Sequence, residues 1–225
     1  MPHPARPVLL LLPGLMCDAG IWRRQIEALG GAWDVRVPDF FGLDSLEAMA
    51  AAALALTDGP FAACGHSMGG RVAMQMAAMA PRRLQRLALM DTGAHPVAEG
   101  EAAKRQVLLD IADVAGMTGV ARAWLPPMVL PARLADQTLM DEMTALVMRA
   151  SVDVLKRQTR ALLQRADGFV QLQQIRCPTA FIVGAQDIWS PPEQHAEMQA
   201  LVPGSTSTVN SCAIAGKSPA SLSMA

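Results

Sequence analysis

Short apolar runs alternate with amphipathic segments in the first part of the chain. The first run, "PVLLLLPG", is continuous, which is typical of a strand buried on both faces of a sheet. The segments between the runs have helical spacing and end at Gly or Pro, as at Gly30-Gly31 and Pro81. This alternation predicts a parallel sheet with helices on both faces. The expected strands are "PVLLLLPG" (7–14), "WDVRVPDF" (33–40), "FAACGHS" (61–67) and "RLQRLALMD" (83–91).

A block of helices interrupts the alternation. From residue 96 to residue 166, helical segments follow one another without a strand signal. A buried strand returns with "CPTAFIVGAQD" (177–187), and a last strand is expected at about 205–209. We therefore interpret the chain as an α/β fold, a mostly parallel sheet with helices on both faces and an inserted helical cap. The expected units are a core of residues 1–95 and 167–225, a cap of residues 96–166, and within the core an atypical tail of residues 205–225.

Composition and charge narrow the class of protein. The 225 residues are 52 % hydrophobic and 17 % charged, with a net charge of −1, so the chain can bury one large core. No basic stripe is interleaved with aromatic residues, which argues against a nucleic-acid partner. No apolar run approaches the roughly 18–20 residues that span a bilayer, which argues against a membrane partner.

The first apolar run and the cysteines favour the cytoplasm. The run is shorter than the roughly 7–15 residues of a signal-peptide core, and Pro13-Gly14 ends it, so we interpret it as a strand. The four cysteines lie far apart without a CxxC pair, as expected for free thiols in a reducing compartment. The four histidines are scattered as well. We therefore expect no metal site and no cofactor.

The stretch "GHSMGG" is the strongest chemical signal in the chain. Ser67 has a glycine two residues before it and another two residues after it, Gly65 and Gly69. This G-x-S-x-G spacing places a serine on a sharp turn from a strand to a helix, where its hydroxyl is exposed to a substrate. The context fits, because a predicted strand precedes the motif and a predicted helix follows it. Ser67 is therefore the candidate nucleophile.

With this motif in its predicted context, the chain resembles the α/β-hydrolase family over roughly residues 8–204. The resemblance rests on "LLLLPGLMCDAGIW", "VPDFFG", "GHSMGG", "LALMDTG" and "CPTAFIVGAQD" in the family's order. It is nearest to the small capped esterases and lactonases. It implies an oxyanion hole made by the amide of Met68 and by that of Leu15 or Met16. It also implies Asp187, after a late strand, as the acid of the catalytic triad, with Asp91 in reserve.

The catalytic histidine of the family has no counterpart in this sequence. The family carries it after the last strand, whereas here the tail "NSCAIAGKSPASLSMA" contains none, and Ile214 stands near its place. His66 adjoins Ser67 and is interpreted as support for the turn. His195 falls on a predicted helix, where we expect it to be solvated. His95 follows the strand next to that of Ser67 and is the one candidate for an alternative base.

Three interpretations of function follow. The first is a serine hydrolase that acts on a small ester, thioester or lactone through an acyl-enzyme on Ser67. The second is a catalytically impaired homologue, truncated or frameshifted near residue 205. The third is a non-catalytic protein that binds a small molecule in a hydrolase-shaped pocket. In each the partner is a small molecule, and neither its identity nor the oligomeric state is indicated by the sequence.

Overall fold

The computed structural model describes residues 5–210, and its centre is one sheet of six parallel strands. The order across the sheet is β2-β1-β3-β4-β5-β6, and every neighbouring pair is parallel. The predictions that concern residues 211–225, including the place of Ile214, lie outside the described residues. The strands are β1 (Val8–Leu12), β2 (Asp34–Arg36), β3 (Phe61–His66), β4 (Leu84–Met90), β5 (Thr179–Gly184) and β6 (Thr206–Asn210).

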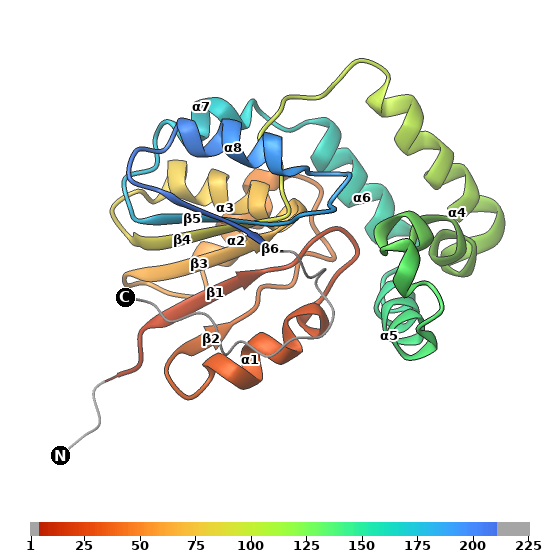
Figure 1. The fold of residues 1–225 in the computed structure, drawn as a ribbon, viewed down its shortest axis with the longest axis horizontal. Helices are drawn as coiled ribbons and strands as arrows, with labels where there is room; N and C mark the ends of the chain where they lie inside the picture. The colour runs from red at the N-terminus through yellow and green to blue at the C-terminus, as the bar shows by residue number, and fades with distance from the viewer. Residues whose placement is uncertain (1–4, 211–225) are drawn as a thin grey trace.

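Helices cover both faces of the sheet, which confirms the predicted fold class (Figure 1). The 3-10 helix η1 (Ala19–Trp22) and helix α1 (Arg23–Leu29) cover one face, where Trp22 packs with Leu9 and Leu11. The other face carries α2 (Leu46–Leu54), α3 (Met68–Met79), α7 (Gly168–Leu172) and α8 (Pro192–Ala200). The larger core lies on this second face. Within residues 5–210, no helix has the length and apolar character that crossing a bilayer requires.

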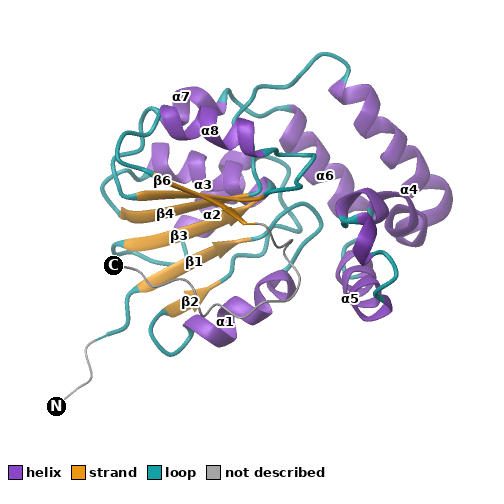
Figure 2. Ribbon diagram, viewed as in Figure 1, coloured by secondary structure: helices purple, strands orange, loops and turns teal. Residues whose placement is uncertain are grey.

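The segment between β4 and α7 contains helices but no strand among its described residues (Figure 2). These helices lie beyond the carboxyl ends of the strands, as expected for a cap. Helix α4 (Glu101–Trp124) is kinked at Gly116, and α5 (Gln137–Met148) and α6 (Val152–Leu163) follow. Two short 3-10 turns, η2 (Pro126–Met128) and η3 (Pro131–Arg133), connect α4 to α5.

Part of the cap packs into the larger apolar core, and exposed ion pairs and a neutral hydrogen bond also join the cap to the core at its rim. The ion pairs join the cap to residues near β1 and β2. On the side of β5, the indole N–H of Trp189 donates to the carbonyl oxygen of Pro127 in the cap, at 3.1 Å. The ion pairs are Arg149–Asp18 (2.5 Å), Arg23–Glu142 (3.1 Å) and Arg160–Asp44 (3.1 Å).

Candidate active site

Ser67 occupies the turn between β3 and α3 in a strained backbone conformation. Its φ of 54° and ψ of −118° lie in a region that non-glycine residues rarely adopt. Neighbouring segments hold it there, because its N–H donates to the Met90 carbonyl at 2.9 Å and its carbonyl accepts from the Thr92 hydroxyl at 2.7 Å. Its own side chain makes no capping bond to α3. The hydroxyl is therefore held at the carboxyl edge of the sheet, at the start of a helix.

The glycines of the motif are required by close backbone approach. A methyl group on Gly65 would lie 2.6 Å from the carbonyl carbon of Gly69. A methyl group on Gly69 would lie 2.6 Å from the carbonyl carbon of Leu12, at the end of β1. Both neighbours are backbone atoms that a side-chain rotation cannot move. The G-x-S-x-G spacing thus reflects how tightly α3 packs against the strands.

The loop after β1 lies against the nucleophile turn. The position of a methyl group on Gly14 is 3.4 Å from Cβ of Ser67. A backbone hydrogen bond from Cys17 N–H to the Gly14 carbonyl, 3.1 Å long, closes a turn in this loop, and Met16 within it has a φ of 58°. Among the described residues, no hydrogen bond engages the amides of Leu15 and Met68. An oxyanion hole formed by these two amides stays a prediction.

The amide of Met16 is engaged elsewhere, which removes it from the two predicted alternatives. It donates to Oε1 of Gln158 at 2.7 Å. Gln158 belongs to cap helix α6 and has 0 % exposed surface, and its Nε2 donates to the Phe40 carbonyl at 3.3 Å. One buried amide thus connects the cap, the loop after β1 and the loop after β2. The sequence interpretation missed Gln158, although it interrupts the apolar face that Leu155 and Leu162 form on α6.

Gln158→Leu is expected to lower the rate of Ser67 chemistry by about 10–100-fold, with a smaller effect on substrate binding. The change leaves the buried Met16 N–H without an acceptor, so the loop that carries Leu15 is expected to shift. Small displacements of catalytic groups lower the reaction rate strongly. The measurement is the rate of Ser67 labelling by a fluorophosphonate probe. Gln158→Glu keeps an acceptor for the Met16 N–H, so its labelling rate should fall less. The exposed substitution Gln174→Leu is the control. Equal rates in all four proteins would contradict a positioning role.

Asp187 lies after β5, at the same edge of the sheet as Ser67, with one strand between their strands. Its Oδ1 accepts the N–H groups of Trp189 and Ser190 at 2.8 and 3.0 Å. Asp91, the reserve acid, follows β4, and its Oδ1 accepts the Gly184 N–H at 2.9 Å. Burial, and the neighbouring Asp187, raise the pKa of Asp91 to about 6. Two carboxyl groups therefore share this edge, and one of them ionises reluctantly.

Asp91→Asn is expected to stabilise the protein at pH 7 by about 2 kcal/mol and to have little effect at pH 4. The pKa of Asp91 is raised in the folded protein, so its favourable contribution is present below pH 4 and is lost as the pH rises towards 6. Asparagine keeps an acceptor for the Gly184 N–H without the charge. Urea unfolding at both pH values measures the difference, with exposed Asp58→Asn as the control. A stability gain that is the same at both pH values would contradict this assignment.

No histidine among residues 5–210 hydrogen-bonds the side chain of Ser67 or of Asp187. His95, the predicted alternative base, has its Nε2 3.3 Å from a carboxylate oxygen of Glu197 on α8, and its ring packs edge-on against Phe169 at 4.8 Å. Both contacts direct its ring to α7 and α8.

His195 contradicts the expectation that it is solvated. Its exposed surface is 0 %, because it lies on the same buried face of α8 as Met198. Its Nε2 accepts the Thr92 N–H at 3.4 Å, and its Nδ1 lies 3.4 Å from the Pro191 carbonyl. Burial lowers its pKa, against the attraction of Asp91 and Asp187. These contacts fit a neutral ring with the proton on Nδ1.

His66 is the histidine nearest to Ser67 in the chain. Its ring lies edge-on to Trp22 with 6.4 Å between centroids, and its buried Nδ1 has no hydrogen-bond partner. Burial lowers its pKa to about 4, although the charge of Asp187 acts in the opposite direction. His66 is therefore neutral at pH 7.

The cysteines near this edge are not nucleophiles. Burial raises the pKa of both the Cys17 and the Cys64 thiol to about 12. Since the thiolate is the reactive form, both groups are inert at neutral pH. Cys177, the third cysteine within the described range, is also a free thiol. Ser67 therefore stays the candidate nucleophile at this turn.

The family model for the alpha/beta hydrolase fold matches residues 7–213, so the chain belongs to the α/β hydrolase family. It is 28 % identical over 221 residues to a putative carbamate hydrolase, RutD, of Pseudomonas savastanoi, in a match that covers 89 % of this chain and 83 % of that protein. It is 33 % identical over 92 residues to a pimeloyl-(acyl-carrier protein) methyl ester esterase of Nitrosomonas europaea. That second match spans 37 % of this chain and only 36 % of the esterase.

Solved structures of the same fold include two hydrolases. An esterase from Thermogutta terrifontis superposes with a TM-score of 0.81 and 24 % identity, covering 91 % of this chain and 82 % of that one. An enol-lactonase from Burkholderia xenovorans gives a TM-score of 0.82 and 20 % identity, covering 94 % and 85 %. At these identities the likeness concerns the fold alone. Together with the family match, the curated relatives assign the chain to the hydrolases.

Proposed function

We propose that the chain is built as a carboxylic ester hydrolase whose nucleophile is Ser67, acting on a small ester, thioester or lactone. The observation that carries the proposal is the strained turn of Ser67, with an uncapped hydroxyl at the start of α3 and the Gly14 loop against it. Strain of this kind persists only where surrounding structure enforces it, and it gathers at functional sites. The relatives' names, an esterase and a carbamate hydrolase, support an acyl substrate.

In the proposed reaction, Oγ of Ser67 attacks the acyl carbonyl carbon while its proton passes to a base. The carbonyl oxygen becomes an oxyanion and accepts hydrogen bonds from the amides of Met68 and Leu15, each worth about 3–4 kcal/mol to the transition state. Collapse of this intermediate releases the alcohol or thiol, which takes up the proton, and leaves an ester on Ser67. Water then attacks that ester, releases the carboxylic acid and regenerates the hydroxyl.

Asp187 is proposed as the carboxylate that would orient a histidine base. The absence of a histidine bonded to Ser67 or Asp187 in residues 5–210 supports a second candidate function, a catalytically impaired protein that binds a small acyl compound without rapid turnover. We also propose a cytoplasmic location, because the three cysteines of the described range are free thiols.

A fluorophosphonate probe tests the nucleophile. The proposal expects covalent labelling at Ser67, located by peptide mass spectrometry, and none in Ser67→Ala. Labelling at another residue would overturn the assignment of the nucleophile. Saturable binding of a small ester without labelling or hydrolysis would favour the binding protein instead.

A further inference from the structure

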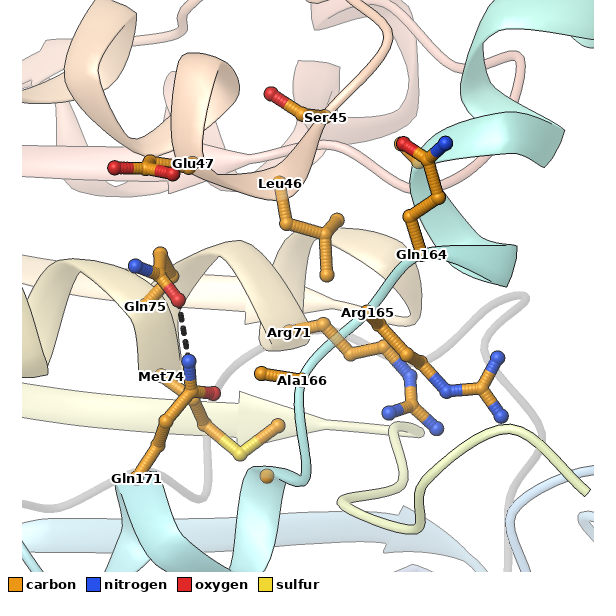
Figure 3. A pocket seen from close by; sticks show the side chains of 12 residues that line it. Ser45, Leu46, Glu47, Arg71, Met74, Gln75, Gln164, Arg165, Ala166 and Gln171 are labelled. Atoms are coloured by element: carbon orange, nitrogen blue, oxygen red, sulfur yellow. Dashed lines mark hydrogen bonds between the residues drawn. The ribbon is translucent and has the colours of Figure 1, made fainter.

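A cavity of about 360 Å³ lies between α2, α3, the end of α6 and α7 (Figure 3). Its volume is at the lower end of the range for small-molecule sites, roughly 300–1,000 Å³. Ser67 is not among its lining residues, so the cavity is separate from the nucleophile turn. The lining residues are Ser45, Leu46, Glu47, Arg71, Met74, Gln75, Ala161, Gln164, Arg165, Ala166, Gly168 and Gln171.

Two arginines of this lining converge on one carbonyl oxygen. Nη1 of Arg71 and Nε of Arg165 each donate to the His95 carbonyl at 3.0 Å. Figure 3 shows the two guanidinium groups side by side. Like charges this close repel each other, so the pair needs negative charge nearby.

Only one of these two arginines has a carboxylate partner among the described residues. Both oxygens of Glu101 accept from Arg165, at 2.8 and 2.6 Å, and Glu101 also pairs with Arg105 at 2.8 Å. Arg71 has no ion pair in that part of the chain. Burial and the charge of Arg165 lower the pKa of Arg71 to about 9, so it still carries its charge at pH 7.

The unbonded nitrogens of Arg71 keep some exposed surface, since none of them is among the fully buried side-chain atoms without a partner. Arg71 is also one of the residues that line the cavity. The one carboxylate whose charge acts on Arg71, that of Glu101, is already paired with Arg165 and Arg105, so a bound anion would stabilise the half-buried Arg71 guanidinium.

The remaining lining indicates the form of the anion. Leu46, Met74 and Ala161 offer apolar surface to the body of a ligand. Glu47 also lines the cavity, and its charge would repel a doubly charged group such as phosphate more strongly than a singly charged carboxylate. We propose that this cavity binds a small monocarboxylate with an apolar tail, whose carboxylate pairs with Arg71. The site is distinct from the proposed hydrolytic centre and does not depend on its activity.

Isothermal titration with hexanoate at constant ionic strength tests the site. Saturable binding to one site is expected, with hexanamide, its neutral counterpart, at least about tenfold weaker because it lacks the charge that Arg71 recognises. Inorganic phosphate should also bind at least about tenfold more weakly than hexanoate. Equal affinity for hexanamide, tighter binding of phosphate, or no binding of hexanoate would each overturn the proposal.

Variants locate the binding at Arg71. Arg71→Met should weaken hexanoate binding by about tenfold or more, while Arg71→Lys should retain part of the affinity because it keeps the charge. Arg24→Met, an exposed arginine on α1 across the sheet, is the matched control and should bind as the unaltered protein does. Circular dichroism melts establish that each variant is folded. Unchanged affinity in folded Arg71→Met, or a loss in Arg71→Lys as large as in Arg71→Met, would overturn the proposed pairing.

Discussion

Replacing residues 211–225 by a Gly-His pair and a covering helix is expected to raise kcat/KM for a small ester by about 10²–10⁴-fold. A positioned general base contributes on the order of 10²–10⁴-fold, and without one Ser67 keeps its proton at neutral pH. The structure supports starting the replacement at residue 211. Strand β6 is already formed beside β5, and it ends at Asn210, at the edge where the Asp187 loop leaves the sheet.

The matched control carries the same segment with Gly-Gln in place of Gly-His. It separates the effect of the imidazole from that of a covered core. Hydrolysis of p-nitrophenyl acetate gives kcat and KM for both proteins and for the present chain. If the present chain is as fast as the Gly-His protein, another group serves as the base, and His66→Gln and His95→Gln identify which of the two histidines it is.

Gly69→Ala is expected to destabilise the fold by about 3 kcal/mol or more, one of the larger effects available to a single methyl group. That methyl group would lie 2.6 Å from the carbonyl carbon of Leu12 and 2.8 Å from the carbonyl oxygen of Pro13. Both are backbone atoms, so relief requires α3 to move away from β1. Such a movement would disturb the Ser67 turn as well.

Gly31→Ala is the control for Gly69→Ala. A methyl group at Gly31 meets nothing within 4 Å, so the same change there should be neutral or slightly stabilising. Urea unfolding of the two variants and the unaltered protein measures the difference. If Gly69→Ala unfolds at the same urea concentration as Gly31→Ala, the packing of α3 on β1 is less tight than described.

The sheet could be predicted from the sequence because several of its strands carry continuous apolar runs. Residues 8–12 and 180–183 are apolar at successive positions, and glycine or proline marks most of the turns between elements. The Ser67 turn could also be predicted, because the close approach of backbone segments there requires glycines at fixed positions around the serine. Strand β6 was harder to predict because it is exposed along its length. Its observed position, Thr206–Asn210, is nevertheless close to the expected 205–209.

The contacts around the site could not be predicted in the same way. Gln158 and Met16 are 142 positions apart, and no local pattern connects a cap helix to a loop after β1. The signal in the sequence was Gln158 itself, a polar residue within the apolar face of α6, which indicates a buried hydrogen bond. His195 was misjudged for a related reason, because the burial of α8 against β5 and β6 depends on how the chain returns after the cap.

The contacts at the rim of the cap determine how this part of the molecule responds to salt. The three ion pairs near β1 and β2, Arg149–Asp18, Arg23–Glu142 and Arg160–Asp44, are exposed, and such pairs are individually weak and screened by salt. The bond from Trp189 to Pro127 carries no net charge and is insensitive to salt. Rising ionic strength therefore weakens these ion pairs, but it leaves the buried hydrogen bonds of Gln158 and the apolar packing of the cap on the core intact. Salt is thus expected to increase the motion of exposed side chains at this rim without separating the cap from the core.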